Sequence, residues 1–262
     1  MLLTRSITAI ILAPLFLALV RVGSPYFDIL VAAIVMVMAW EFTRMDGREG
    51  DKRRILIAAA SVIAVGSVFF LDGVGAPILI VAAATVAVIA ADQIAGRSGL
   101  ALVQAAVIYA ALPAIALLFV HRVGGYQSVF WLLAVVWMTD IGAYAFGRII
   151  GGPKLAPAIS PNKTWAGAVG GFFCGIAAGT AVLMWLGRPP TAGIVALAGA
   201  VSICTQAGDL FESALKRRYQ VKDSGGLIPG HGGVMDRFDG LWAAAPAAAA
   251  MCVLLGGGVL SW

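Results

Sequence analysis

Long apolar stretches separated by short polar segments make up most of this chain. Runs without Asp, Glu, Lys or Arg cover residues 55–71, 73–91, 98–121, 123–139, 164–187, 189–208 and 240–262. Several of them reach the roughly 20 apolar residues that a helix needs to cross a bilayer. Segments near 7–20 and 25–43 are two further candidate spans, the second with Glu41 near its end. The pattern predicts an all-α, polytopic transmembrane helical bundle of about nine spans.

The composition agrees with a membrane protein. Hydrophobic residues make up 61% of the 262 positions and charged residues only 12%. The mean hydropathy of +0.96 lies outside the range of soluble globular domains. Arg5 followed by an apolar run to Val20 resembles a secretory signal peptide, but the residues after it lack a clear small-x-small cleavage site. We therefore expect this segment to remain as the first transmembrane helix.

The net charge of +5 indicates membrane topology and not a nucleic-acid partner. With nine spans and a cytoplasmic N-terminus, Arg21, Arg122 and Arg188 are the only ones of the 18 Lys and Arg residues that lie outside. Such an excess of cations in cytoplasmic segments follows the positive-inside rule. The polar segments of the C-terminal half are therefore expected to face the cytoplasm, where nucleotides are found.

Polar residues divide the chain into two regions of different character. Residues 1–120 are predicted to form apolar packing and anchor helices, and the polar segment 44–54 is expected to be a solvated anchor on the membrane face. Asp72 and Asp92 stand at the ends of spans and are expected to be boundary residues. Residues 121–262 hold the other strongly polar segments and form the predicted catalytic region.

Asp140, Tyr144 and Arg148 repeat at i, i+4 and i+8 late in a predicted span, so they share one helix face. A carboxylate at that depth is costly, and such residues are functional candidates by default. An ion pair between Asp140 and Arg148 at the helix end is the alternative interpretation.

A proline-rich segment follows this span. Three prolines within 153–161 exclude a continuous helix there. Ser160, Lys163 and Thr164 then stand at the start of a glycine-rich span, where free amides and the helix dipole favour an anion. A capping serine and a lysine that extends to the membrane surface are the alternative. The glycines of the span are expected to serve helix packing.

Acidic residues near two helix ends predict a metal site. One predicted helix carries Asp209, Glu212, Ser213 and Lys216 at i, i+3, i+4 and i+7, and the last helix begins with Asp236 and Asp239. Magnesium takes oxygen ligands and is often shared between carboxylates and substrate phosphates. We therefore predict Mg²⁺ bound by Asp209, Glu212, Asp236 and Asp239, whereas ion pairing within each group is the alternative.

The segment 213–239 concentrates five cations, three carboxylates, one histidine and five glycines. Its glycines allow the backbone to approach a ligand closely. His231, between Gly230 and Gly232, is expected to contact a nucleotide phosphate or base, with a purely structural role in the loop as the alternative. The segment is typical of a polyphosphate site next to a membrane.

The whole of this segment, from Ser213-Ala-Leu-Lys-Arg217 to Gly230-His-Gly-Gly-Val-Met-Asp-Arg-Phe-Asp239, resembles the signature of bacterial phosphatidate cytidylyltransferases, or CDP-diacylglycerol synthases. The segments 140–148 and 154–167 resemble that family's other polar segments. Ala166 stands where the family often has an acid, so no role is carried over for it. The similarity covers roughly residues 139–240, and the N-terminal helices match in hydropathy alone.

The resemblance implies a multi-pass enzyme of the bacterial inner membrane, with its active site facing the cytoplasm. It would convert CTP and phosphatidate to CDP-diacylglycerol and pyrophosphate in a magnesium-dependent reaction, with a second cation, monovalent or divalent, and a homodimer left open. Its catalytic residues would be Asp209, Lys216, His231 and Asp236. Substrate contacts would come from Asp140, Tyr144, Arg148, Ser160, Lys163, Thr164, Ser213, Arg217, Lys222, Asp223, Gly232, Gly233 and Arg237.

Two other functions are compatible with the sequence. A CTP-dependent transferase or kinase acting on another membrane lipid would use the same acids and cations. A secondary transporter would use Asp140, Asp209 and Glu212 for ion coupling. Against transport, hydropathy shows no two similar halves, and the polar residues cluster at one face of the membrane.

Overall fold

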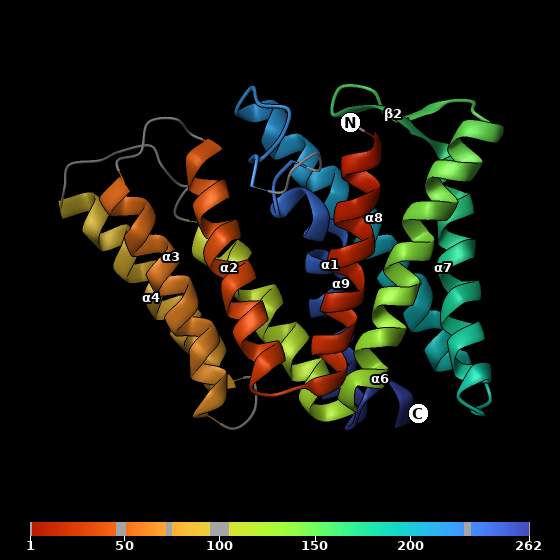
Figure 1. Cartoon of the computed structure of the whole chain (residues 1–262), viewed down its shortest axis with the longest axis horizontal. Coiled ribbons are helices and arrows are strands. Elements are labelled where there is room, and N and C mark those ends of the chain that lie inside the picture. The colour runs from red at the N-terminus through yellow and green to blue at the C-terminus, as the bar shows by residue number, and fades with distance from the viewer. Residues whose placement is uncertain (1, 46–50, 72–74, 95–104, 228–231, 262) are drawn as a thin grey trace. The chain divides into compact units, whose positions relative to one another are not determined.

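The computed structural model describes residues 2–45, 51–71, 75–94, 105–227 and 232–261, with the side chains before Ile10 left out (Figure 1). The described chain is almost entirely helical, which confirms the predicted all-α fold. It divides into two compact units. Unit 1 holds Met1–Phe119 and Val221–Arg237, and unit 2 holds Val120–Gln220 and Phe238–Trp262. Residues 221–237 of the signature segment 213–239 therefore group with the N-terminal helices, and the division into an anchor region and a catalytic region at residue 120 stays a prediction.

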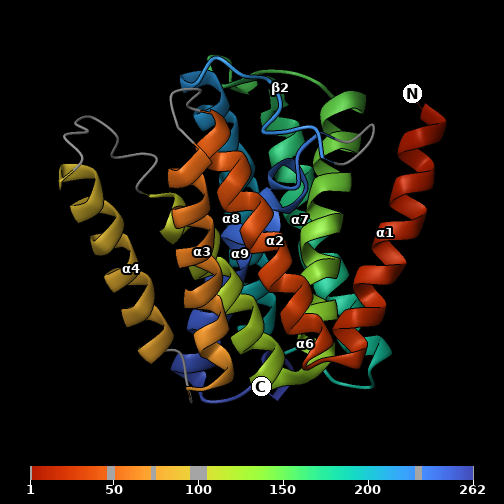
Figure 2. The same cartoon turned by 60° about the vertical axis from the view of Figure 1, so that its left-hand side comes forward.

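Unit 1 is built from apolar helices joined by short turns. They are α1 (Leu2–Val22), α2 (Tyr26–Met45), α3 (Asp51–Gly66), the short 3-10 helix η1 (Ser67–Phe69), α4 (Gly75–Ile94) and the first part of α6 (Ala106–Ile149). Figures 1 and 2 show α2, α3 and α4 side by side. Their core includes the fully buried Phe27, Phe42 and Ile57, because each helix turns one apolar face to its neighbours.

Unit 2 combines helices with one small hairpin. It holds the second part of α6, β1 (Lys154–Ala156), β2 (Ser160–Thr164), α7 (Trp165–Trp185), α8 (Ala192–Arg218), most of α9 (Met235–Leu255) and the 3-10 helix η2 (Val259–Ser261). The predicted absence of helix across the prolines is confirmed. In its place β1 and β2 pair antiparallel, with Lys154 opposite Thr164, a hairpin that the prediction of an all-α fold did not include.

Glycines bring the helices of unit 2 into close contact. A Cβ at Gly171 of α7 would lie 2.7 Å from the Thr139 carbonyl oxygen of α6, and one at Gly167 would lie 2.6 Å from the Ala143 oxygen. Small residues at such positions allow backbones to approach in a membrane. The expected packing role of these glycines is therefore confirmed.

Six helices in the described ranges are long and apolar enough to cross a membrane, namely α2, α4, α6, α7, α8 and α9. Helix α6 has 44 residues and is interrupted at Gly125, whose φ of 67° and ψ of −175° are not helical. Its two parts contain the described residues of the predicted apolar runs 98–121 and 123–139. The apolar part of α1, Ile10–Val22, and the 16-residue α3 are shorter. Nine spans and a cytoplasmic N-terminus stay predictions.

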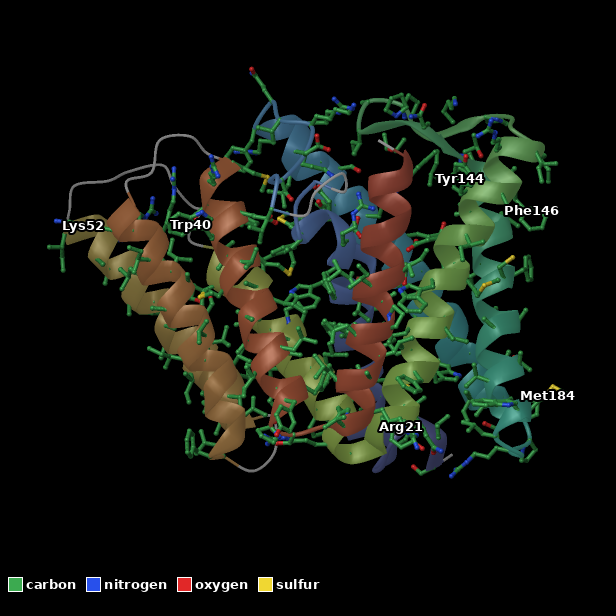
Figure 3. The ribbon with its side chains drawn as sticks, viewed as in Figure 1. Arg21, Trp40, Lys52, Tyr144, Phe146 and Met184 are labelled. Atoms are coloured by element: carbon green, nitrogen blue, oxygen red, sulfur yellow. The ribbon has the colours of Figure 1, made fainter. Side chains whose placement is uncertain are left out.

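Exposed side chains support placement in a membrane. Leu79 is 70% exposed and Phe173 is 62% exposed, as expected for helix faces in contact with lipid. Within unit 1, Arg21 lies at the opposite end of the helices from Trp40 and Lys52 (Figure 3). Charges at both ends of an apolar layer are the arrangement that a bilayer requires.

Arg53 of α3 and Asp92 of α4 form a buried ion pair. Their residues are only 3% and 2% exposed. Asp92 stands in the last turn of α4, as expected for a residue at the end of a span. The expectation that Arg53 is solvated was wrong, because each charge neutralises the other within the unit. Asp72 lies outside the described residues.

Candidate active site

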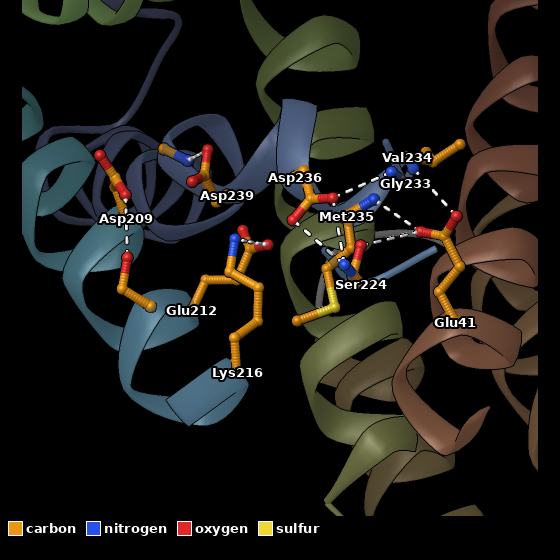
Figure 4. A network of polar contacts seen from close by, with 12 residues as sticks. Glu41, Asp209, Glu212, Lys216, Ser224, Gly233, Val234, Met235, Asp236 and Asp239 are labelled. Carbon is orange, nitrogen blue, oxygen red and sulfur yellow. Dashed lines mark hydrogen bonds and ion pairs between the residues drawn. The ribbon is translucent and has the colours of Figure 1, made fainter. Parts of the chain in front are cut away.

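The end of α8 carries the predicted face of acids and cations. Lys216 Nζ lies 3.2 Å from Glu212 Oε1, and Ser213 Oγ donates to Asp209 Oδ1 at 3.5 Å (Figure 4). These contacts follow from the i, i+4 spacing, which places side chains above one another on a helix. The prediction that these residues share a face is confirmed.

Lys163 of β2 reaches across to this face. Its Nζ lies 2.7 Å from Asp209 Oδ2, and both side chains are partly exposed. The hairpin positions the lysine, because β2 leads directly into α7, whose first turn is capped by Thr164 Oγ1 accepting from Gly167 N at 3.1 Å. The cap that the alternative interpretation assigned to a serine is therefore made by Thr164, and Lys163 pairs with an acid.

Asp239 joins the group because α8 and α9 approach closely. A Cβ at Gly208 would lie 2.6 Å from the Asp239 carbonyl oxygen and 2.5 Å from Ala243 Cβ. Asp239 thereby lies within electrostatic range of Asp209, Glu212 and Lys216. Its Oδ1 also accepts from Gly240 N at 2.7 Å. Three of the four predicted metal ligands are therefore neighbours in unit 2.

A cavity of about 550 Å³ opens beside these acids in unit 2. Asp140 and Asp209 both line it, and Asp140 lies within electrostatic range of Asp209, Asp239 and Lys163. The remaining lining residues are Ala143, Tyr144, Gly147, Arg148, Leu155, Asn162, Lys163, Thr164, Gly167, Ala168 and Gln206. The polar segments 140–148 and 154–167 thus meet Asp209 in one cavity.

Arg148 donates through Nη1 to the Tyr144 hydroxyl at 2.7 Å, and its guanidinium lies 6.0 Å from the centre of the Tyr144 ring. Among the described side chains, Arg148 forms no ion pair with Asp140, so that alternative was wrong. Arg148 and Asp140 both line the cavity.

Asn162 and Gln206 also line the cavity, although neither was predicted from the sequence. Gln206 precedes Asp209 by one helical turn, so the face shared with Asp209 could have identified it. Its Nε2 donates to the Ala168 carbonyl at 3.2 Å. Ala166 instead lines a separate apolar groove with Phe146 and Phe173, away from the polar cavity.

Two other predicted residues lie near the cavity without lining it. Ser160 begins β2 and is half-buried. Arg217 is exposed, and its Nε donates to the Ile159 carbonyl at 3.3 Å. This contact ties the end of α8 to the hairpin.

The rest of the predicted site belongs to unit 1. Asp236 Oδ2 accepts from Gly233 N at 2.9 Å and from Ser224 N at 3.1 Å, next to the first turn of α9. Gly232 has a φ of +82°, which favours glycine. Lys222, Asp223 and Arg237 are exposed. His231 lies outside the described residues, so its predicted role stays a prediction.

Glu41 of α2 is a polar group whose role the sequence did not predict. Its carboxylate is buried in unit 1 and accepts from Val234 N at 3.0 Å and Met235 N at 2.9 Å (Figure 4). It also borders a cavity of about 770 Å³, lined by Met36, Val37, Trp40, Arg44, Met45, Val221, Asp223, Ser224, Gly225, Gly226 and Leu227. An acid inside a predicted span was the available signal.

The metal prediction depends on the carboxylates of unit 2. In the described part of the chain, no three His, Cys, Asp or Glu side chains are arranged to hold one metal ion. The chemistry of the donor set nevertheless suits Mg²⁺, which takes hard oxygen ligands and completes its shell with water and phosphate. Two lysines pair with these acids. Asp209, Glu212 and Asp239 therefore remain candidate ligands.

The fold and the cavity define a polytopic membrane protein with a charged site suited to phosphate groups. The sequence model of the family described as "Cytidylyltransferase family" matches residues 3–255. The chain therefore belongs to the cytidylyltransferase family.

Curated relatives agree with the family match. A protein of Brucella suis biovar 1 named phosphatidate cytidylyltransferase is 41% identical over 244 residues, which cover 92% of this chain and 90% of the relative. A protein of the same name from Pseudomonas aeruginosa is 34% identical over 273 residues, covering 98% and 99%. One from Staphylococcus haemolyticus is 43% identical over 122 residues, covering 46% and 47%.

Proposed function

We propose that the chain is a phosphatidate cytidylyltransferase of bacterial phospholipid biosynthesis. It transfers the cytidylyl group of CTP to phosphatidate and releases pyrophosphate. Near full-length similarity to proteins of that name supports the activity. The observation that carries the proposal is the cavity of unit 2, in which Asp140 and Asp209 stand beside Arg148 and Lys163, because acids and cations in one cavity suit substrates that are all phosphates.

The reaction makes one phosphorus–oxygen bond and breaks another. A phosphate oxygen of phosphatidate attacks the α-phosphorus of CTP, and the bond between that phosphorus and the oxygen bridging to the β-phosphate breaks, so that pyrophosphate leaves. The lipid phosphate is already an anion at neutral pH, so the attack needs no strong base. Catalysis therefore consists mainly of holding two anions together and stabilising the charge on the leaving group.

Several charged residues of unit 2 are available to bind the substrates and to stabilise the leaving group. Arg148 and Lys163 face the cavity and provide positive charge for phosphate oxygens. Tyr144 holds the Arg148 side chain in place through its hydroxyl. Lys216, paired with the buried Glu212, adds a third cation at the end of α8. These cations attract both CTP and phosphatidate, which are anions.

Mg²⁺ completes the proposed site. Asp209, Glu212 and Asp239 of unit 2 would hold it. When bound, the metal neutralises charge on the triphosphate and on pyrophosphate. The three carboxylates lie close enough to interact electrostatically, so a divalent cation relieves their mutual repulsion.

The proposed location is the bacterial inner membrane, with the site on the cytoplasmic side. The excess of Lys and Arg in the predicted cytoplasmic segments supports this orientation. Phosphatidate then reaches the site from the bilayer and CTP from the cytoplasm. A homodimer remains an expectation from the family.

Purified protein with CTP, Mg²⁺ and phosphatidate tests the proposal. Formation of CDP-diacylglycerol together with an equal amount of pyrophosphate is expected. A lipid kinase would release CDP in place of pyrophosphate, so the nucleotide product separates the two reactions. Pyrophosphate release with a polyprenyl phosphate but not with phosphatidate would reverse the choice of lipid. An unrelated membrane protein purified in the same detergent serves as the control for contaminating activity.

A further inference from the structure

Glu41 of α2 accepts hydrogen bonds from two parts of the signature segment, residues 213–239. Its Oε1 accepts from Val234 N at 3.0 Å, and its Oε2 accepts from Met235 N at 2.9 Å. Ser224 Oγ donates to the same Oε2 at 3.4 Å. Ser224 precedes the Gly-His-Gly-Gly motif in the sequence, and Val234 follows it. One carboxylate therefore holds the chain on both sides of the motif.

Two signature glycines make room for this carboxylate. A Cβ at Gly225 would have only Glu41 atoms as its nearest neighbours, among them Cδ at 2.8 Å and Cγ at 3.0 Å. A Cβ at Gly233 would lie 2.7 Å from Glu41 Oε2 and would also overlap Ser224 Oγ. Gly225 and Gly233 are not among the residues with positive φ. Space for Glu41, and at Gly233 also for Ser224, therefore explains why these positions lack a side chain; backbone conformation does not require it.

The contacts also have a favourable electrostatic setting. Val234 N and Met235 N lie at the start of α9, where amide groups lack partners within the helix and the helix dipole is positive. A carboxylate that accepts these amides is stabilised there, and hydrogen bonds to a charged acceptor are stronger than those between neutral groups. Glu41 is 4% exposed, so its hydrogen bonds are largely shielded from bulk water.

We propose that Glu41 is a positioning residue for cytidylyl transfer, one that holds the signature segment in its working conformation without touching substrate. This inference rests on the proposed function. It assigns a catalytic consequence to a residue of the N-terminal helices, which were predicted from the sequence only to pack and to anchor the chain in the membrane. Because Glu41 acts through the loop, its loss changes kinetic constants in protein that is still folded.

The first experiment compares Glu41→Gln and Glu41→Ala with wild type at a temperature well below the unfolding midpoint of each variant. Glutamine keeps one acceptor oxygen, whereas alanine keeps none. The expected kcat/KM for CTP falls at least about tenfold in Glu41→Ala and by less in Glu41→Gln. Equal kcat/KM in all three proteins would overturn the proposal.

Asp92→Asn is the matched control. It also removes a buried carboxylate charge from unit 1, but its partner is Arg53 of α3 and not the signature segment. The expected unfolding midpoint is lower than that of wild type, with kcat and KM unchanged within about twofold. A loss of kcat/KM as large as that of Glu41→Ala would make the effect a general result of destabilisation and would refute positioning.

A double-mutant cycle with Gly225→Ala tests the contact itself. The added methyl group displaces Glu41, so Gly225→Ala alone is expected to lower kcat/KM at least about tenfold. In the Glu41→Ala background that methyl group has nothing to displace, so it is expected to add no further loss. Equal losses in both backgrounds would refute the proposal. Because Gly225→Ala keeps Glu41, this arm remains informative if Glu41→Ala fails to fold.

Hydrogen exchange of the Val234 and Met235 amides separates this inference from the proposed function. Exchange is expected to be faster in Glu41→Ala and Gly225→Ala than in wild type and Asp92→Asn. The measurement needs no substrate, so it remains decisive if wild type fails to convert CTP and phosphatidate. Unchanged exchange in both variants would overturn the role of Glu41 whatever the assay shows.

Discussion

Lys163 of the β-hairpin and Asp209 of α8 form an ion pair of 2.7 Å on the wall of the cavity in unit 2. The two residues are 46 positions apart in the sequence. One is a candidate ligand for lipid or nucleotide phosphate, and the other is a candidate metal ligand. Their contact therefore brings a candidate phosphate-binding group and a candidate metal ligand together in one cavity.

Asp209→Asn is expected to abolish turnover without loss of folded protein. The amide removes the negative charge that attracts both Lys163 and a divalent cation, but it keeps the size of the side chain. We expect kcat/KM to fall by at least about a hundredfold, measured by pyrophosphate release. Ser213→Ala removes only the 3.5 Å hydrogen bond to Asp209 and is the milder comparison. Near-normal activity in Asp209→Asn would contradict the metal proposal.

Removal of divalent cations is expected to stop the reaction, and added Mg²⁺ is expected to restore it. Glu212 is fully buried. Its contribution to metal binding is measured by titrating Mg²⁺ against activity. In Glu212→Gln the Mg²⁺ concentration for half-maximal rate should rise about tenfold or more, because one anionic oxygen donor is lost. An unchanged Mg²⁺ dependence would remove Glu212 from the ligand set.

Gly208→Ala is expected to separate α8 from α9. The new Cβ would lie 2.6 Å from the Asp239 carbonyl oxygen, and overpacking of this kind costs about 1–3 kcal/mol of unfolding free energy. Activity should fall as well, because Asp239 is shifted from Asp209. Gly193→Ala on the same helix is the matched control, since its Cβ would meet only Thr191 Oγ1 at 4.0 Å. Equal thermal stability of the two variants would refute the close helix contact.

Variants of Asp236 separate its contribution to stability from its contribution to catalysis. Asp236→Asn keeps an oxygen that can accept from Gly233 N and Ser224 N, so the unfolding midpoint should change little. Asp236→Ala loses both hydrogen bonds and should be less stable than Asp236→Asn by about 1–2 kcal/mol. If Asp236 is also a metal ligand, both variants lose turnover. Full activity in Asp236→Asn would leave it with the structural role alone.

Thr164→Ala is expected to lower stability by about 1 kcal/mol, because the hydroxyl caps the first turn of α7. Thr164→Ser keeps the hydroxyl and should restore most of that stability. Thermal unfolding of both variants measures the cap. Their kcat and KM for CTP then show whether the same hydroxyl also contacts substrate, as the sequence predicts. A stable Thr164→Ala protein would contradict the capping role.

Local features of the site were predictable because they depend on helix geometry. The shared face of Asp209, Glu212, Ser213 and Lys216 follows from spacing alone, and so does the contact between Tyr144 and Arg148. Glu41 was not predictable in its role, because its partners stand almost 200 positions away in the sequence. The burial of Arg53 with Asp92 was missed as well, because the two residues lie on different helices, 39 positions apart in the sequence.

The sequence by itself determined that the chain is an all-α membrane protein, which faces of its helices are polar, and which family it resembles. These properties depend on composition, on apolar runs and on residues a few positions apart. Only the tertiary structure decided that Gly208 brings Asp239 to Asp209, that Lys163 pairs with Asp209, and that Glu41 holds the signature segment. Such contacts depend on how closely helices, strands and loops approach one another, and those distances are set by packing between residues far apart in the chain.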